Sequence, residues 1–330
     1  MRVLVTGGAG FIGIHLCRRL LADGHSVTVL DNEFNGRREN IPQGASFVPG
    51  DVVRTEDMEP VFAKGLDAVC HIAGQVSIIR AFSDPVADLR TNTEGTVNVL
   101  KLCVKYKVPR LIYASSMTLY GDTERVPTPE SEPCVPDSYY GITKFAAERY
   151  VHATAERPDL GFEFGVTSLR MFSVYGPGQS FNNPYQGVLG IFSGNILRGE
   201  PITIFGDGEQ TRDFVFVGDI VDGWARALSE KKSHGAVVNL GSGRSTSITQ
   251  LAEAVTGAFG YKPGEYKINR APGRPGEQRK VQADISRAKA LLDWQPKTTF
   301  EAGLGETVRW AKAAYQADPT AAAFGGRSAQ

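Results

Sequence analysis

The sequence predicts an α/β fold, a doubly wound parallel sheet followed by a smaller mixed α/β region. Up to about residue 177, short apolar runs alternate with amphipathic stretches. The first run leads into a glycine-rich turn, and the second ends in an acid, Asp31. Beyond residue 178 this alternation stops, and glycine, proline and asparagine separate short elements. Alternating strands and helices are typical of a parallel sheet covered by helices on both faces.

Length and charge narrow the classes of function. The 330 residues suffice for about two domains, and the formal net charge at pH 7 is zero. No basic surplus indicates nucleic acid or an anionic membrane, and no apolar run approaches the ~20 residues of a bilayer span. The chain opens on an expected strand without a leader, so we expect a cytoplasmic protein. The four cysteines share no short spacing, so neither a disulfide nor a metal site is expected.

The glycine-rich turn joins the first expected strand, 2–5, to a helix that begins near Ile14. Two spacings overlap in it, one formed by Gly8, Gly10 and Gly13 and one by Gly7, Gly10 and Gly13. Glycine allows the tight turn and lets a pyrophosphate approach the main chain over the positive end of the helix. Either spacing alone is weak evidence, but the context predicts a dinucleotide site.

The second expected strand, 26–30, ends in Asp31-Asn32, at the distance where an acid accepts a hydrogen bond from a ribose 2′-hydroxyl. An acid there repels a 2′-phosphate, which favours NAD over NADP. Arg37 and Arg38 follow in the loop and would favour the phosphate, unless they are solvated loop charges.

Further residues fall at the ends of later strands, where ligands bind in an open parallel sheet. Asp51 and Val52 follow the strand 45–48 and are placed to border an adenine, although Asp51 would also serve as a loop cap. Small residues, Ala73-Gly74-Gln75, follow the strand 67–72 and let the backbone approach a cofactor.

The expected catalytic groups come from the next two elements. A strand at 110–114 ends in Ser115 and Ser116, and Tyr140 and Lys144 are four residues apart, on one face of a helix that runs to about 156. A tyrosine with an ordinary pKa near 10 needs about 4 kcal/mol of help to act as a base near neutrality. Lys144 and an oxidised nicotinamide would supply it. The alternative is an ordinary helix start, since this spacing is common.

The remaining elements are shorter. We expect helices at 88–106, 187–198 and 218–229, a strand at 165–172, two short strands around an Asp207-Gly208 turn within 202–217, a strand at 237–240 that returns to the main sheet, a strand around Val281 and a final pair of helices.

Together these motifs resemble the extended short-chain dehydrogenases/reductases. Within them the chain is similar to the NAD-dependent epimerase/dehydratase family, nearest to the UDP-glucose 4-epimerases, from Val3 to about Trp310. Asn92 with Gly95-Thr96 and Tyr175-Gly-Pro177 add to the resemblance. It implies a Rossmann-type NAD-binding domain at 1–177 with returning segments near 215–245, a substrate domain at 178–317 and a disordered tail at 318–330.

The resemblance also implies roles for particular residues. Tyr140 is the acid/base, Lys144 holds the nicotinamide ribose and lowers the pKa of the tyrosine, Ser116 bridges to the sugar O4, and Thr118 lies nearby. A tightly bound NAD contacts Gly7, Gly10, Phe11, Ile12, Gly13, Asp31, Asn32, Asp51, Val52, Ala73, Gly74, Gln75, Asn92, Ser115, Tyr140, Lys144 and Phe172.

The implied nucleotide-sugar site draws on the second region. Arg212 and Arg274 grip the diphosphate, which suits their planar forks, although Arg274 in its Pro- and Gly-rich loop would also fit a surface position. Glu277 lies near the nucleotide ribose. The full set is Ser116, Thr118, Tyr140, Ser173, Asn183, Val188, Phe205, Gln210, Arg212, Arg274 and Glu277.

Departures from the family pattern bear on the reaction. Where this chain has Met117-Thr118, dehydratases carry Asp-Glu. Decarboxylases carry a glutamate at the position of Thr118. Many uronate epimerases carry an arginine after the Tyr-Gly-Pro segment, where this chain has Gln179. Ser173 stands where the 4-epimerases usually have an asparagine that faces the diphosphate, and Met171 where they often have a tyrosine.

These observations predict a 4-epimerase that interconverts UDP-glucose and UDP-galactose through a transient 4-keto sugar. The alternatives are a UDP-glucuronate 4-epimerase, another nucleotide-sugar epimerase or reductase, and a non-enzymatic NAD-binding regulator. Retention of the serine, tyrosine and lysine together disfavours the regulator. A homodimer through a four-helix bundle is expected from the helices near 91–106 and 140–156, with no nucleic-acid partner.

Overall fold

The computed structural model describes residues 1–181, 187–273 and 278–317. Within them, the centre of the protein is a parallel sheet of seven strands, which confirms the α/β prediction. In spatial order the strands are β11 (Ala236–Leu240), β6 (Gly165–Met171), β5 (Arg110–Ser116), β4 (Ala68–His71), β1 (Arg2–Thr6), β2 (Ser26–Asp31) and β3 (Ser46–Pro49). The strand order reverses at β1, which pairs with β2 on one side and β4 on the other. Such a reversal opens a crevice at the carboxyl ends of the strands.

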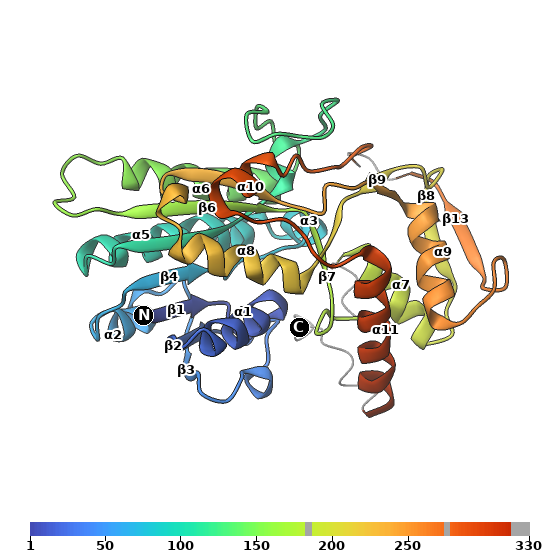
Figure 1. The fold of residues 1–330 in the computed structure, drawn as a ribbon, viewed down its shortest axis with the longest axis horizontal. Helices are drawn as coiled ribbons and strands as arrows, with labels where there is room; N and C mark the ends of the chain where they lie inside the picture. Colours follow the sequence, from blue (N-terminus) through green and yellow to red (C-terminus); the bar gives the residue numbers. More distant parts are fainter. Residues whose placement is uncertain (182–186, 274–277, 318–330) are drawn as a thin grey trace.

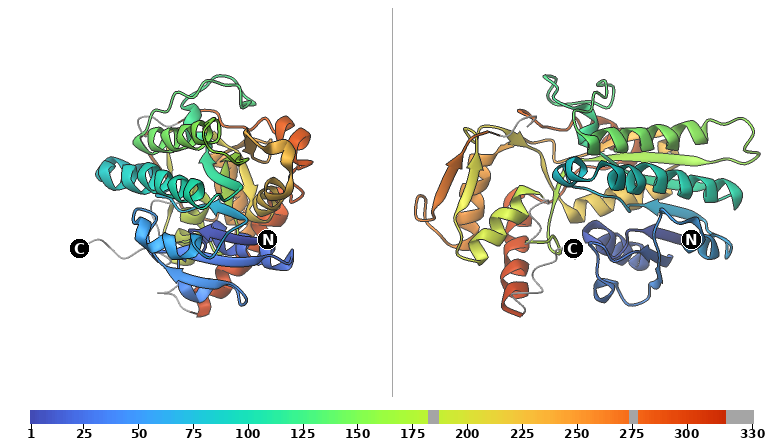
Figure 2. Two further views of the ribbon diagram at one scale, coloured as in Figure 1. Left: turned by 90° about the vertical axis from the view of Figure 1, so that its left-hand side faces the viewer. Right: turned by 180° about the vertical axis from the view of Figure 1, so that it is seen from behind.

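Helices cover both faces of this sheet (Figures 1 and 2). On one face lie α1 (Phe11–Ala22), α8 (Val217–Ser229) and α10 (Ser286–Leu292), and on the other α2 (Thr55–Phe62), α5 (Gly95–Lys105) and α6 (Tyr139–Ala155). The alternation of a strand divides the core: Val3 and Val5 pack with the first layer and Leu4 with the second.

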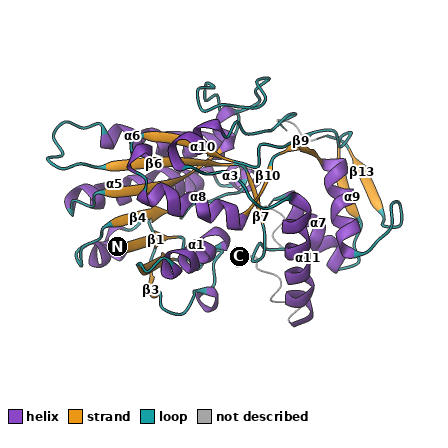
Figure 3. Cartoon of the chain, viewed as in Figure 1, coloured by secondary structure: helices purple, strands orange, loops and turns teal. Residues whose placement is uncertain are grey.

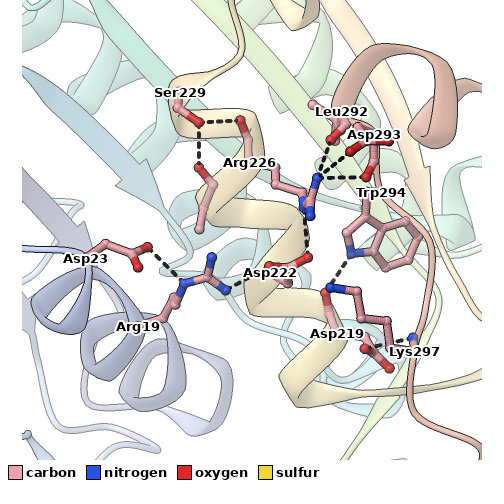
Figure 4. A network of polar contacts seen from close by, with 11 residues as sticks. Arg19, Asp23, Asp219, Asp222, Arg226, Ser229, Leu292, Asp293, Trp294 and Lys297 are labelled. Atoms are coloured by element: carbon pink, nitrogen blue, oxygen red, sulfur yellow. Dashed lines mark hydrogen bonds and ion pairs between the residues drawn. The ribbon is translucent and has the colours of Figure 1, made fainter.

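A polar network fastens the first helical layer (Figure 4). Arg19 of α1 binds Asp222 of α8 at 2.8 Å. The indole of Trp294 donates to the backbone oxygen of Asp219 at 2.8 Å, and the Asp219 carboxylate accepts the N–H groups of residues 297 and 298 at 3.0 Å each. The late segment after α10 is therefore tied to α8.

The second region, at the right of Figure 1, uses short strands in pairs rather than one sheet. Its helices are α7 (Val188–Leu197), α9 (Ile248–Phe259) and α11 (Phe300–Ala317). They contribute Phe192, Leu251 and Leu304, respectively, to one hydrophobic core. The strand pairs are parallel β7 (Ser173–Tyr175) with β10 (Phe214–Phe216), parallel β8 (Ile202–Phe205) with β13 (Ile268–Ala271), and antiparallel β9 (Thr211–Arg212) with β12 (Thr246–Ser247), as Figure 3 shows in orange.

Of two strand predictions in this region, the one around Asp207-Gly208 was confirmed and the one around Val281 was wrong. Strands β8 and β9 flank Asp207-Gly208 as predicted, and each pairs with a distant segment, β8 with β13 and β9 with β12. No strand forms around Val281. A single β-bridge joins Ala283 to Thr128, because the loop carrying Thr128 meets this segment at one point.

The predicted helix at 88–106 is interrupted. It comprises α4 (Pro85–Leu89), a π-helix, η2 (Arg90–Glu94), and α5. A Cβ at Gly95 would come within 2.6 Å of the Val52 side chain, so this junction packs closely against the sheet edge. The remaining short helices are α3 (Ile78–Ser83) and the 3₁₀ turns η1 (Arg38–Asn40), η3 (Met117–Tyr120) and η4 (Lys231–Ser233). Of the helices in the described ranges, none is long and apolar enough to cross a membrane.

Candidate active site

A cavity of 720 Å³ lies at the carboxyl edge of the central sheet, against the second region. It brings together most of the residues singled out from the sequence. Those that line it are Gly7, Gly10, Phe11, Ile12, Gly13, Asp31, Asn32, Asp51, Val52, Ala73, Gly74, Gln75, Ser115, Ser116, Tyr140, Phe172, Ser173, Val188, Phe205, Gln210 and Arg212. Asn183, Arg274 and Glu277, and the tail from 318, lie outside the described residues.

The glycine turn is packed against backbone. Gly7 has φ +70°, and a Cβ on Gly13 would lie 2.3 Å from the Gly7 oxygen and 2.6 Å from the Cα of Gly8. A Cβ on Gly8 would instead meet the side chain of Val29. No side chain caps α1, so the N–H groups of its first turn face the cavity edge without a side-chain acceptor. This cradle fits a dinucleotide pyrophosphate.

Asp31 is held at the end of β2 in a fixed orientation. Its carboxylate accepts the backbone N–H of Ala9 at 3.0 Å and of Glu33 at 2.8 Å. Burial raises its pKa. Asn32 donates to Asp51 at 2.9 Å, which joins the ends of β2 and β3. This arrangement leaves carboxylate lone pairs for ribose hydroxyls.

The start of α6 presents the tyrosine. The hydroxyl of Ser138 accepts the N–H of Gly141 at 3.2 Å and so caps the helix, which places Tyr140 in the first turn at the cavity wall. Lys144 follows one turn later, buried behind the wall, with Nζ 4.4 Å from the centroid of the Tyr113 ring.

The hydroxyl of Ser116 has a defined direction. Its Oγ accepts from Thr118 twice, from the N–H at 3.3 Å and from Oγ1 at 2.9 Å. A serine hydroxyl has two acceptor lone pairs and one proton, so the proton of Ser116 is not used in its contacts with Thr118, and hydrogen bonding by Ser116 acts to lower the pKa of Tyr140. Thr118 does not line the cavity and acts through Ser116.

Burial shifts the pKa of both Tyr140 and Lys144. It raises the pKa of Tyr140 to about 12, with the Ser116 hydrogen bond working in the opposite direction, and it lowers the pKa of Lys144 to about 7. Desolvation is the largest influence on the pKa of each group.

Asn92 lies behind the wall rather than in it. Its Oδ1 accepts the N–H of Gln75 at 2.9 Å, and its Nδ2 faces the backbone oxygen of Gln75 at 3.1 Å and Asp88 at 3.0 Å. Asn92 thus shapes the cavity edge through Gln75. The sequence analysis missed Asp88, although its spacing of four from Asn92 on one helical face was a usable signal.

Two further lining residues were missed or set aside. They are Phe34, from the loop after β2, and Arg80, from α3. The guanidinium carbon of Arg80 lies 4.0 Å from the centroid of the Phe34 ring. This cation–π contact joins two walls of the cavity. No local pattern in the sequence pairs them.

The second region contributes the opposite wall. Nη1 of Arg212 donates to the backbone oxygens of Thr211 at 2.7 Å and of Gln278 at 2.9 Å. Nε2 of Gln210 donates to the oxygen of Phe205 at 2.9 Å. The guanidinium of Arg212 is thus fixed against the cavity by backbone contacts from two segments.

Few acids border the cavity. Among its described lining residues the carboxylates are Asp31 and Asp51, which follow β2 and β3. In the sheet, β4 and β1 separate these strands from β5, which leads to Ser116. The described ranges hold no cluster of three or more His, Cys, Asp or Glu residues suited to a metal ion.

Comparison with known proteins gives a consistent family. Residues 3–241 match the NAD dependent epimerase/dehydratase family. A UDP-glucose 4-epimerase of Thermotoga maritima, solved with UDP-glucose, has a TM-score of 0.89 and 37% identity, covering 95% of this chain and 99% of that one. That of Thermus thermophilus, solved with NAD, has a TM-score of 0.85 and 36% identity, covering 94% and 98%. UDP-glucuronic acid decarboxylase 1 of Xenopus tropicalis is 34% identical over 314 residues, 94% of this chain and 72% of the relative.

Proposed function

Because the chain belongs to the NAD dependent epimerase/dehydratase family, we propose that it is a UDP-sugar 4-epimerase that interconverts UDP-glucose and UDP-galactose. Its cofactor is NAD, which when bound supplies a nicotinamide ring able to accept and return a hydride. The observation that carries the proposal is that Tyr140 and Ser116 line the same cavity, while the contacts of Ser116 with Thr118 leave its own proton unused.

Tyr140 moves the proton. Its Oη takes the proton of the sugar 4-hydroxyl and later returns it, while Ser116 holds the same oxygen. Lowering a pKa of about 12 to neutrality requires about 7 kcal/mol, more than the roughly 1.5–3 kcal/mol of one hydrogen bond to a charged group. Positive charge is therefore needed beside the phenol, and Lys144 provides it.

The distribution of acids favours epimerisation over elimination. Eliminating water across C5 and C6 needs an acid and a base besides the tyrosine. The cavity carboxylates in the described chain, Asp31 and Asp51, lie toward the β2–β3 edge of the sheet. Met117 and Thr118, beside Ser116, carry no ionisable group. Epimerisation at C4 requires only the groups that are present.

A neutral hexose fits the sugar side better than a uronate. Gln179 lines the cavity, is 5% exposed, and has an Oε1 without a hydrogen-bond partner in the described structure. Such an amide suits a hydroxyl group. Arg80 is a cation on the cavity wall, but its guanidinium lies over the ring of Phe34, so we do not assign it to a sugar carboxylate.

Proton NMR of the anomeric signals tests the activity. Purified protein is incubated with UDP-glucose, UDP-glucuronate or dTDP-glucose without added reductant. We expect interconversion of UDP-glucose and UDP-galactose without net NADH. Turnover of UDP-glucuronate alone would favour the uronate epimerase, accumulation of NADH a dehydrogenase, and no turnover of any sugar the regulator.

The Tyr140→Phe variant tests the mechanism. We expect kcat to fall at least about 100-fold, because the general acid/base is removed while the ring remains. Tyr139→Phe is the matched control, since the neighbouring Tyr139 is 46% exposed and stacks on Phe82 outside the cavity. Full activity of Tyr140→Phe would exclude the proposed role.

We propose in addition that the protein is a homodimer that pairs α5 and α6 with their mates. Exposed apolar side chains gather on α3, α4 and α6, which are packed together, namely Ile78, Phe82, Val86, Leu89, Tyr139, Ile142 and Tyr150. Helices α5 and α6 run side by side on this face (Figure 2). Light scattering tests the proposal, and the mass of a single chain at micromolar concentration would exclude it.

A further inference from the structure

A buried carboxylate lies behind the cavity wall and takes no part in the chemistry above. Asp88, in α4, is fully buried. It accepts hydrogen bonds from Nε2 of Gln75 at 2.7 Å, Nδ2 of Asn92 at 3.0 Å and Oγ1 of Thr143 at 2.6 Å. These donors are neutral, so hydrogen bonding within the described chain leaves the charge of Asp88 uncompensated.

The three donors lead to the catalytic groups. Thr143 immediately precedes Lys144, and its Oγ1 also lies 3.1 Å from the backbone oxygen of Tyr140. A Cβ on Gly74 would lie 2.9 Å from Oδ1 of Asn92 and 3.8 Å from Nζ of Lys144. Both Oδ1 of Asn92 and the lysine ammonium therefore lie close to Gly74.

The buried acid of α6 provides a contrast. Glu148 forms a two-pronged pair with Arg170, at 2.5 Å and 3.1 Å, and accepts the hydroxyl of Ser115 at 2.6 Å. Its charge is neutralised inside that pair. Asp88 has no such arginine, and an unpaired buried charge is costly unless another charge offsets it.

We propose that Asp88 is a positioning residue for Lys144, an inference that rests on the proposed function: its carboxylate holds Asn92 and Thr143 in place and supplies the negative charge that keeps the lysine protonated. The two buried charges offset each other across a short network. Burial lowers the pKa of Lys144, and Asp88 is the largest influence in the opposite direction.

Among the other groups near Lys144, Glu148 also acts to raise the pKa of the lysine, although less than Asp88 does and while paired with Arg170. On the elements packed around Lys144 these groups are Tyr140 and Glu148 of α6, Tyr113 of β5, His71 of β4, Arg170 of β6, Arg80 of α3, and Arg90 and Glu94 of η2. Burial raises the pKa of both tyrosines and lowers that of His71 to about 3, so these three are neutral. Arg90 and Glu94 are exposed and pair with each other at 3.8 Å.

The titration of Lys144 tests the proposal without any sugar. Protein labelled with ¹³C at lysine Cε reports the midpoint by NMR, and Lys144→Arg assigns the signal. In Asp88→Asn we expect the midpoint to fall from about 7 by about one pH unit, the lower end of the effect of a nearby opposite charge. An unchanged midpoint in a folded variant would overturn the proposal.

Asp219→Asn is the matched control. Asp219 is a buried carboxylate of α8, in the helical layer on the other face of the sheet, where it holds the N–H groups of residues 297 and 298 (Figure 4). Its loss removes hydrogen bonds without removing charge near Lys144, so the midpoint should stay in place. An equal fall in this variant would show a general loosening of the fold and contradict the proposal.

If Asp88→Asn does not fold, Thr143→Val separates charge from hydrogen bonding. This variant removes one hydrogen-bond donor to Asp88 and leaves its carboxylate in place. The titration midpoint of Lys144 should therefore not fall, whereas kcat should decrease. A fall of one unit in this variant would overturn the charge role.

Activity supplies an independent readout. Because the reaction needs protonated Lys144, activity is lost as pH rises through its pKa, and Asp88→Asn should shift this alkaline limb to lower pH and approach wild type in acid. If the wild type turns over no UDP-sugar, the proposed function fails, while the NMR titration still decides the role of Asp88.

Discussion

The two walls of the cavity are built in different ways. On the sheet side, five residue pairs join β1 to β2 and four join β1 to β4, and helices cover both faces. On the opposite side, β9, which carries Arg212, is joined to β12 by two residue pairs. A position set by many neighbours tolerates little change, whereas one set by few can change its ligand contacts without disturbing the fold.

The largest effect expected from this difference is at Gly13. In Gly13→Ala the Cβ would lie 2.3 Å from the Gly7 oxygen, a backbone atom that cannot move alone. We expect the affinity for NAD to fall at least about 100-fold, the cost of overpacking by roughly 3 kcal/mol. Isothermal titration calorimetry with NAD measures it.

The control lies in the other region. Gly257, within α9, has nothing within 4 Å of an added Cβ. Gly257→Ala should keep the affinity for NAD and raise the free energy of unfolding by about 0.5–1 kcal/mol, since alanine favours a helix. Equal affinities for NAD in both alanine variants would remove the contrast between the walls.

A smaller effect is expected at Arg212. In Arg212→Ala we expect KM for the UDP-sugar to rise about 10- to 100-fold, the loss of one charged hydrogen-bonding group, while the affinity for NAD stays unchanged. Steady-state kinetics and calorimetry measure the two quantities. The control is Arg157→Ala, because Arg157 is exposed and pairs with Asp159 at 2.6 Å, away from the cavity. A parallel loss of NAD affinity at Arg212 would show that the two walls are not independent.

The smallest effect concerns acid stability on the sheet side. His71 is fully buried between the hydroxyls of Thr6 at 2.7 Å and Thr96 at 3.0 Å, and burial lowers its pKa to about 3 from an ordinary 6.5. As pH falls below 6.5 the unfolded chain binds a proton that the folded chain does not, so stability is lost. From pH 6.5 to 5 this amounts to about 2 kcal/mol.

Urea melts of His71→Gln at the two pH values test this prediction. The acid-induced loss should shrink by about 2 kcal/mol, whatever the change in stability at neutral pH. The half-exposed His25 provides the control, because His25→Gln should keep most of the wild-type loss. An identical loss in His71→Gln and wild type would show that His71 is protonated in the folded state.

The same contrast explains what could be predicted from the sequence. On the sheet side, each strand is followed directly by its site residues, so Gly13, Asp31 and Ser116 could be placed from local patterns. On the other side, the partner of β8 lies far along the chain in β13, so the local Asp207-Gly208 turn indicated the strands but not their pairing. Asp88 was missed because its importance depends on contacts with Gln75 and Thr143 that the fold creates.

The first helical layer has a consequence for how the protein is made. The core beneath it joins Val3 and Leu16 to Trp224, Val238 and Trp294. A ribosome that has released the first 177 residues has supplied most of the sheet strands but neither the edge strand β11 nor the helix α8 that packs on α1. The glycine turn is therefore synthesised more than half of the chain length before α8, the helix that packs on α1. Full burial of this sheet face therefore requires segments that are synthesised late, including α8 and Trp294.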